Sequence, residues 1–186
     1  MILGVVGKIA VGKSTVLDIL KKKGFYCIDA DKLVHELYKN GKEGQVLVKE
    51  YFGEKYLLSN GDVDREKLAE LVFEKKSKLL LLNRLIHPCV AKEVKVLIEK
   101  AEKTYENIAV EAVYFDEKYL GGIVDKILLI ERDFELAKDV LIGERGLGFD
   151  VAKKIYDTVT LPNKVDFVIK NNGTLKDLEN ELLKIL

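Results

Sequence analysis

The sequence is poor in several residue types, and each shortage narrows what the chain can be. It has no tryptophan, one methionine, two prolines and only two cysteines among 186 residues. The cysteines, Cys27 and Cys89, lack the spacing of a metal site, and their apolar surroundings predict buried thiols in a reducing compartment. Apolar runs such as LLLL at 79–82 are far too short to cross a bilayer.

The sequence also has no excess of positive or negative residues. Lys+Arg and Asp+Glu both number 31, so no overall field would gather nucleic acid or hold the chain on an acidic membrane. The chain starts directly with MILGVVG, without a basic leader or cleavage site, which predicts a cytoplasmic protein. An anionic ligand must therefore be held by a local site. Nothing in the sequence indicates an oligomeric state.

Short apolar runs alternate with amphipathic, helix-like segments along much of the chain. This alternation predicts a parallel sheet, because parallel neighbours need long crossover connections that are usually helices. We therefore expect an α/β fold with a five-stranded parallel sheet sandwiched by helices, and ligands at the carboxyl ends of the strands. The expected strands are 2–6, 25–28, 108–113, 126–130 and 167–170.

Two segments depart from this alternation. From about 41 to 106 the pattern is helical apart from the turn SNGD at 59–62, with Asp64 expected to cap one helix and a long helix expected to begin near Pro88. We interpret this block as an insertion within a single domain spanning 1–186. The polar, glycine-broken segment at about 141–164 predicts a mobile lid over the carboxyl edge of the sheet.

A phosphate-binding pattern, G-x-x-x-x-G-K-[ST], lies between the first expected strand and the first expected helix. Its glycines let backbone N–H groups surround phosphate oxygens, and the helix N-terminus adds partial positive charge. The lysine reaches the β and γ phosphates, and the serine can ligate Mg²⁺. The pattern predicts a P-loop NTPase core whose ATP-binding residues are Gly7, Lys8, Ile9, Ala10, Val11, Gly12, Lys13, Ser14 and Thr15.

Carboxylates lie at or near the ends of two of the expected strands. In the stretch IDAD, extended backbone would turn Asp29 and Asp31 to the same side, toward the phosphates. One carboxylate there can orient an acceptor hydroxyl, and another can hold magnesium through water. Either aspartate can instead cap the following helix. Glu111, near the end of the expected strand 108–113, places another carboxylate near the P-loop, where it can also hold magnesium through water.

These motifs together resemble the dephospho-CoA kinases, P-loop enzymes that phosphorylate the ribose 3′-hydroxyl of dephospho-CoA to complete coenzyme A. The likeness runs nearly end to end through GKIAVGKST, GFYCIDADKLVHEL, FGEKY, NGDVDREKLAELVF, LIHP and VDFVIKNNGTLKDLENEL. The resemblance implies an ATP-dependent phosphotransferase with an alcohol acceptor, with ATP and dephospho-CoA as substrates and Mg²⁺ accompanying ATP. It also implies that the 41–106 block is the acceptor lobe.

The resemblance implies roles for individual residues. Asp31 is expected to be the catalytic carboxylate, and Arg65 and His87 to lie near the acceptor. Without the resemblance, Arg65 would be interpreted as a solvated first-turn charge and His87 as a helix-start residue. Asn172 and Gly173, within NNGT, are expected near the adenine edge, although that stretch is equally typical of a helix N-cap.

The chain departs from the family pattern at two places. The family's proline-leucine-leucine run ending in glutamate is replaced by VEAVYFDE, which leaves Glu111, Asp116 and Glu117 as alternatives for the carboxylate near magnesium. In the lid, Arg145 can supply the family arginine, which would neutralise charge on the transferring phosphoryl group. The family glutamine that follows is absent, because the sequence has no glutamine after position 45.

Three other functions compete with this interpretation. NKVD at 163–166 spells the guanine-reading motif of GTP switches, but its hydrophobic run follows the motif instead of preceding it. Another small kinase of the nucleoside or nucleotide type would use the same P-loop and sheet. A structural ATP-binding module would leave Asp31 and Arg145 without a role.

Overall fold

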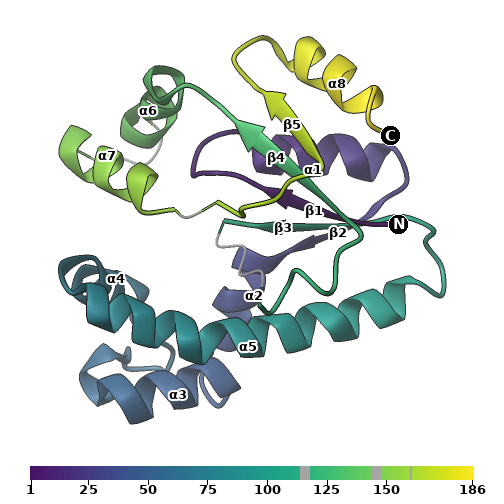
Figure 1. Ribbon diagram of the computed structural model, residues 1–186. Coiled ribbons are helices and arrows are strands. Elements are labelled where there is room, and N and C mark those ends of the chain that lie inside the picture. The colour runs from purple at the N-terminus through teal and green to yellow at the C-terminus, as the bar shows by residue number, and fades with distance from the viewer. Residues whose placement is uncertain (114–117, 144–147, 160) are drawn as a thin grey trace. The chain divides into compact units, whose positions relative to one another are not determined.

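The computed structural model describes residues 1–113, 118–143, 148–159 and 161–186 (Figure 1). The chain divides into two compact units. The sheet unit consists of Met1–Asp29 and Leu97–Leu186, and the helical unit consists of Ala30–Val96. None of the helices in the described ranges is both long and apolar enough to cross a membrane.

The sheet unit is built on a five-stranded sheet in which every neighbouring pair is parallel. The strand order is β2-β3-β1-β4-β5, which places β1 in the centre. All five strands begin and end within two residues of the predicted runs, so the α/β prediction is confirmed. The strands are β1 (Ile2–Val6), β2 (Tyr26–Asp29), β3 (Ile108–Ala112), β4 (Lys126–Glu131) and β5 (Phe167–Lys170).

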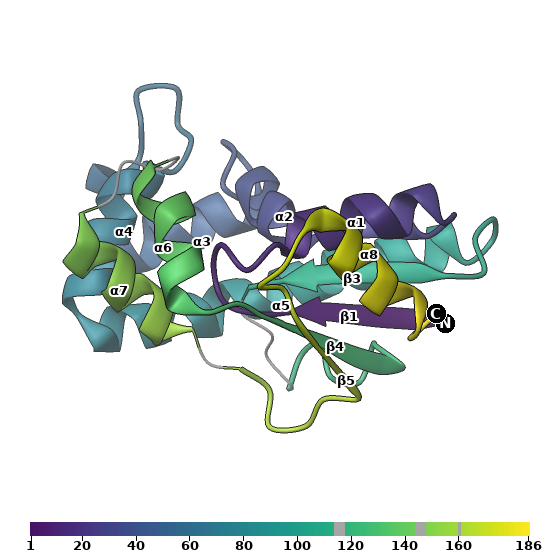
Figure 2. The ribbon, with the colours of Figure 1, turned by 90° about the horizontal axis from the view of Figure 1, so that it is seen from above.

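Helices α1 (Lys13–Lys22) and α8 (Leu175–Leu183) lie side by side against the sheet (Figures 1 and 2). Apolar residues spaced three or four apart on each helix join the buried strand residues in one core cluster. Helices α6 (Phe134–Gly143) and α7 (Phe149–Thr158) follow β4 and add residues to the same cluster. Core members include Val16 and Leu20 of α1, Leu178 and Leu182 of α8, Leu141 of α6 and Tyr156 of α7.

The helical unit contains α2 (Ala30–Leu37), α3 (Glu43–Phe52), the 3₁₀ turn η1 (Glu54–Tyr56) and α4 (Arg65–Glu74). Asp64 caps α4, as predicted, since its side chain accepts a hydrogen bond from Lys67 N at 3.1 Å. The predicted turn at 59–62 is present, and Leu57 and Val63 form an isolated antiparallel bridge around it.

The long helix α5 (Lys76–Ala101) shows that the start predicted near Pro88 is wrong. Pro88 lies inside the helix, where a missing N–H and ring crowding cost about 3 kcal/mol. Each fully buried aliphatic side chain contributes about 1.5–3 kcal/mol, so a continuous apolar stripe outweighs that cost. The stripe runs without a break through the proline as Leu82, Ile86, Cys89, Val90, Val94 and Ile98.

The two cysteines differ in environment. Cys89 is buried, as predicted, and its Sγ donates to the carbonyl of Leu85 at 3.4 Å. Cys27 is only partly buried, which corrects the prediction, because it lies on the edge strand β2 with a neighbour on one side only. Its environment still excludes enough water to raise the pKa of the Cys27 thiol to about 11.

Candidate active site

The loop between β1 and α1 is the centre of the candidate site. Its backbone has positive φ at Gly7 (155°), Ala10 (63°) and Gly12 (97°), and α1 begins at Lys13. A Cβ at Gly7 would overlap the Ile130 carbonyl oxygen. One at Gly12 would overlap the side-chain amide of Asn171. Glycine is therefore favoured at both positions by the backbone conformation and by the close approach of the loop to β4 and to the segment after β5.

The same loop leaves the start of α1 suited to an anion. Gly12 is the N-cap residue of α1 and has no side chain that could occupy the first N–H groups of the helix. Those groups carry the positive end of the helix dipole. The loop and the helix start together form a phosphate-binding arrangement of the kind that the sequence pattern predicts.

Lys13 and Glu111 are two buried charged residues at this loop, 5% and 6% exposed. Lys13 Nζ donates to the Lys8 carbonyl oxygen at 2.9 Å and lies 3.9 Å from Glu111 Oε1. The first contact holds the ammonium group against the loop backbone. Burial strengthens the interaction of this ammonium group with any nearby anion, because little water screens it.

Glu111 also aligns with a carboxylate on the neighbouring strand. It pairs in register with Asp29 of β2 and with Val5 of β1. Side chains of paired residues in a parallel sheet project from the same face, so the two acidic residues occupy adjacent positions near the carboxyl edge. Ser14 is exposed in the first turn of α1. In the described part of the chain, no three His, Cys, Asp or Glu side chains gather as a metal cluster.

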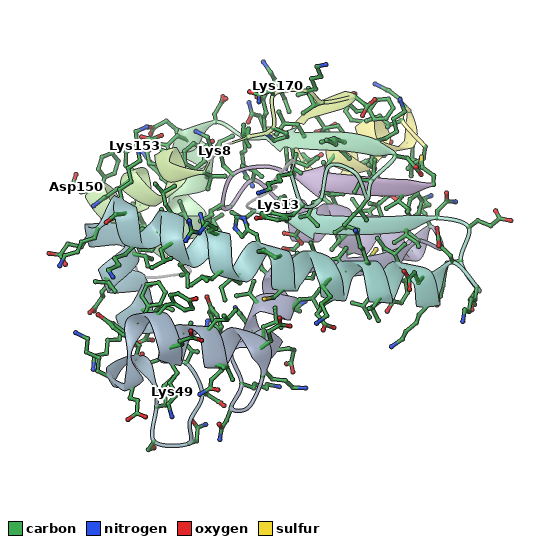
Figure 3. The ribbon with its side chains drawn as sticks, turned by 60° about the horizontal axis from the view of Figure 1, so that its bottom comes forward. Lys8, Lys13, Lys49, Asp150, Lys153 and Lys170 are labelled. Atoms are coloured by element: carbon green, nitrogen blue, oxygen red, sulfur yellow. The ribbon has the colours of Figure 1, made fainter. Side chains whose placement is uncertain are left out.

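A pocket of about 220 Å³ lies beside the loop at the carboxyl ends of β4 and β5. Tyr156 of α7 forms part of its wall: its hydroxyl donates to the Arg132 carbonyl at 2.6 Å, and its ring lies 4.3 Å from Lys8 Nζ. Burial, and then the nearby carboxylates, raise the pKa of the Tyr156 phenol, so it remains a donor at neutral pH. Figure 3 shows Lys8 beside α7.

The segments after β4 and β5 are joined by hydrogen bonds at the pocket. Asn171 N donates to the Glu131 carbonyl at 2.8 Å, and Asp133 N donates to Asn172 Oδ1 at 2.9 Å. Asn171 Nδ2 reaches across to the Val11 carbonyl of the loop at 2.8 Å. Arg132 Nε is buried without a hydrogen-bond partner among the described residues, which makes it a further candidate for contacting an anionic ligand.

Sequence reasoning missed Arg132 and Tyr156. Arg132 had a usable signal, because it directly follows a buried strand, where parallel sheets bind ligands. No signal in the sequence pointed to Tyr156, because its contacts with Lys8 and Arg132 depend on how α7 packs.

Three of the predicted catalytic and acceptor residues lie in the helical unit. Asp31 lies in the first turn of α2, Arg65 is the first residue of α4, and His87 lies within α5. The strand alternation predicted for Asp29 and Asp31 is wrong, because β2 ends at Asp29 and α2 begins at the next residue. The roles of Asp31, Arg65 and His87 stay predictions. Arg145, Asp116 and Glu117 lie outside the described residues.

NNGT leads into α8. Thr174 is the N-cap of that helix and forms a capping box with Asp177, which confirms the N-cap interpretation of this stretch. Asn172 and Gly173 precede the cap, and Asn172 lines the pocket. Their predicted place at an adenine edge stays a prediction.

NKVD is not a guanine-reading site. Asp166 directly precedes β5, and its carboxylate accepts hydrogen bonds from Lys126 Nζ and Ile127 N, both at 2.8 Å. Lys126 is the first residue of β4. Asp166 therefore lies at the amino ends of the strands, whereas the phosphate-binding loop follows the carboxyl end of β1.

Comparisons with known proteins agree with this geometry. The dephospho-CoA kinase family model matches residues 1–177. A dephospho-CoA kinase from Fusobacterium nucleatum is 40% identical over 183 residues, covering 96% of this chain and 93% of the relative. The solved dephospho-CoA kinase from Campylobacter jejuni has a TM-score of 0.68 at 26% identity and covers 99% of this chain and 94% of its own.

A more distant likeness concerns the fold alone. Shikimate kinase from Acinetobacter baumannii has a TM-score of 0.57 at 14% identity, with 99% of this chain and 91% of that chain covered. The match of the family model over nearly the whole length and the 40% identical relative are far more specific. The chain belongs to the dephospho-CoA kinase family.

Proposed function

We propose that the protein transfers the γ-phosphoryl group of ATP to the ribose 3′-hydroxyl of dephospho-CoA, which gives coenzyme A. As a member of its family it is an ATP-dependent phosphotransferase. The observation that carries the proposal is the glycine-lined loop with the buried ammonium group of Lys13, in a chain that the family model matches over residues 1–177.

The triphosphate of ATP would lie on the loop Gly7–Thr15. Backbone N–H groups of the loop and of the start of α1 would donate to phosphate oxygens, and Lys13 would balance charge on the β and γ phosphates. Arg132 and Lys8 line the adjoining pocket and would add positive charge there. Phosphoryl transfer needs little covalent chemistry from the protein, so positioning and charge stabilisation would supply most of the rate enhancement.

Magnesium fits the donor atoms near the loop. Ser14 offers a hydroxyl oxygen, and Asp29 and Glu111 offer carboxylates at adjacent register positions. Mg²⁺ prefers such oxygen donors and keeps several of its waters, so these residues would hold it partly through water. When bound with ATP, the ion supplies charge that offsets the negative charge of the phosphates. Asp116 and Glu117 are alternatives for the same role.

The acceptor side of the proposal rests on the family resemblance. Asp31 would align the 3′-hydroxyl for in-line attack, and Arg65 and His87 would bind dephospho-CoA within an acceptor lobe at about 41–106. Arg145 would stabilise the transferring phosphoryl group from a lid at about 141–164. We further propose a cytoplasmic enzyme without a nucleic-acid partner, in keeping with its balanced charge.

The test is ADP release from ATP·Mg²⁺ with purified protein, with and without dephospho-CoA, and with the mass of the product recorded. Adenosine and AMP serve as control acceptors. We expect dephospho-CoA alone to gain one phosphate. Phosphate transfer to adenosine or AMP instead would assign the chain to another P-loop nucleoside or nucleotide kinase, and ATP binding without transfer to any acceptor would also contradict the proposal.

Replacing the predicted catalytic carboxylate tests the mechanism. Asp31→Asn should lower kcat by about 10²- to 10⁴-fold, the usual contribution of a positioned acid or base, while the Kd for ATP stays within about twofold of the wild-type value. Asp18→Asn, the same change at an exposed position of α1, is the matched control. An unchanged kcat in Asp31→Asn would remove this residue from the mechanism.

A further inference from the structure

Asn171 is unusual among the polar residues of the sheet unit, because its side chain is buried. It is 8% exposed, and the other buried polar residues among those described are Lys13, Gln45 and Glu111. Burying an amide costs free energy unless its hydrogen bonds are made inside the protein. Asn171 Nδ2 donates to the Val11 carbonyl at 2.8 Å, across 160 positions of sequence.

The partner of Asn171 is the peptide group that leads into Gly12. This peptide is trans, so its carbonyl oxygen and its N–H point in opposite directions. With the Val11 carbonyl held by Asn171, the Gly12 N–H must point away from Asn171. The positive φ of Gly12 (97°) and the close approach of its Cα to the Asn171 amide fix the same arrangement.

Asn171 is itself held in place. Its backbone N–H donates to the Glu131 carbonyl at 2.8 Å, and it directly follows β5. The next residue, Asn172, accepts from Asp133 N through Oδ1 at 2.9 Å. The amide of Asn171 is therefore presented to the loop from a fixed backbone, joined to the carboxyl end of β4.

We propose that Asn171 is a positioning residue for the phosphate groups of the nucleotide. It holds the Val11–Gly12 peptide in the orientation that directs the Gly12 N–H to a phosphate oxygen. This inference rests on the proposed ATP site, and it gives Asn171 a role different from the one that its stretch of sequence predicts, near the adenine base. The role concerns the phosphates, because the side-chain amide bonds to the phosphate-binding loop.

The two roles predict different losses of affinity. Three probes are compared by displacement of a fluorescent ATP analogue: ATP·Mg²⁺, inorganic tripolyphosphate·Mg²⁺, which has no base, and adenosine, which has no phosphate. Asn171→Asp replaces the donor by a carboxylate of the same shape, which repels the Val11 carbonyl. Asn171→Ala is the second variant if the aspartate variant does not fold. Asn180→Asp, at an exposed position of α8, is the matched control.

We expect Asn171→Asp to raise the Kd for ATP and the Kd for tripolyphosphate by the same factor, about 10- to 100-fold. This factor corresponds to the loss of a hydrogen bond to a charged group. Adenosine should bind as it does to the wild-type protein. If Asn171 instead contacted the adenine base, the variant would bind adenosine and ATP more weakly and would bind tripolyphosphate like the wild-type protein. That result would overturn the inference. A purely structural role would lower the melting temperature and weaken no probe selectively, which would overturn it too.

These measurements do not involve the acceptor. If ATP proves to be the donor but dephospho-CoA is not phosphorylated, the proposed function fails and the binding test for Asn171 remains valid. If dephospho-CoA is phosphorylated and Asn171→Asp binds tripolyphosphate like the wild-type protein, the inference fails alone.

Discussion

Two lysine–carboxylate pairs lie at opposite ends of the parallel strands, and they differ in burial and in the distance between their charges. At the carboxyl edge, Lys13 and Glu111 are both buried, with Nζ and Oε1 3.9 Å apart. At the amino edge, Lys126 and Asp166 approach to 2.8 Å, yet their side chains are 49% and 34% exposed. The pair with the shorter contact is the one that water screens more.

The difference shows which pair can act on a ligand. An exposed ion pair contributes little, because solvent competes with both charges. Asp166 mainly fastens the start of β5 to β4, since it also accepts from Ile127 N. Lys13 is held by the loop backbone in a poorly hydrated place, where its charge would act strongly on the phosphate oxygens of the proposed nucleotide. A short contact is therefore a poorer guide to function than burial and position at the carboxyl edge.

Truncating each lysine gives the largest expected contrast. Lys13→Ala should lower kcat/KM by about 10³-fold or more and weaken ATP binding, because it removes charge stabilisation from the transferring phosphoryl group. Lys126→Ala should leave kcat/KM within about twofold of the wild-type value, because the exposed pair lies at the other edge. The measurement is steady-state kinetics with dephospho-CoA, alongside calorimetric titration of ATP. Equal losses of kcat/KM in Lys13→Ala and Lys126→Ala would contradict the expected difference between the buried and the exposed pair.

Two glycines extend the comparison from charge to backbone. Gly12, at the carboxyl edge, and Gly24, which precedes β2 at the amino edge, have nearly equal φ of 97° and 87°. A Cβ at Gly24 meets no atom within 4 Å, so Gly24→Ala should cost only the strain of positive φ, about 1–2 kcal/mol in the free energy of unfolding.

Gly12→Ala adds an overlap with the Asn171 amide to the same strain. It should therefore destabilise the protein more than Gly24→Ala and should weaken ATP binding about tenfold or more, because the loop must move. Urea denaturation and ATP titration measure the two effects. ATP affinity preserved in Gly12→Ala would mean that the loop adjusts freely, contrary to its close packing.

Most of the sheet could be predicted from the sequence because its strands are buried. The central strand Ile2–Val6 is a continuous apolar run, and the strand Ile108–Ala112 is apolar except for the buried Glu111, so side chains on both faces of these strands are covered. The loop was predictable for a related reason: its glycines and Lys13 form a local pattern whose position between strand and helix is visible in the chain.

Features that depend on packing or on distant segments could not be predicted. The helix running through Pro88 follows from a buried stripe on both sides of the proline, which outweighs a local breaking signal. The contact of Asn171 with Val11 joins the two ends of the chain, and no local pattern reports it. Asp29 and Asp31 failed as an alternating pair because the exact end of a strand is set by the fold, not by the dipeptide spacing.

The smallest expected effect concerns the amino edge and its response to acid. The hydrogen bond from Lys126, and then that from Ile127 N, hold the pKa of the Asp166 carboxyl below its ordinary value. A lowered folded-state pKa means that the ionised carboxylate stabilises the fold above the unfolded pKa, near 4, and that this stability is lost as pH falls through the lowered value. Asp166→Asn should therefore melt slightly below the wild-type protein at pH 7, by less than about 4 °C, and the two melting temperatures should converge as pH approaches 2.

Lys126→Ala removes the same pair from its other side and should reproduce this convergence, while kinase activity at pH 7 stays unchanged in both variants. Melting temperatures measured across the acid range test the expectation. A constant difference between Asp166→Asn and the wild-type protein at every pH would show that the carboxylate stabilises β5 by shape alone. The charges of Lys126 and Asp166 would then contribute nothing to stability. The difference between this exposed pair and the buried pair of Lys13 and Glu111 would be larger than their burial and distances suggest.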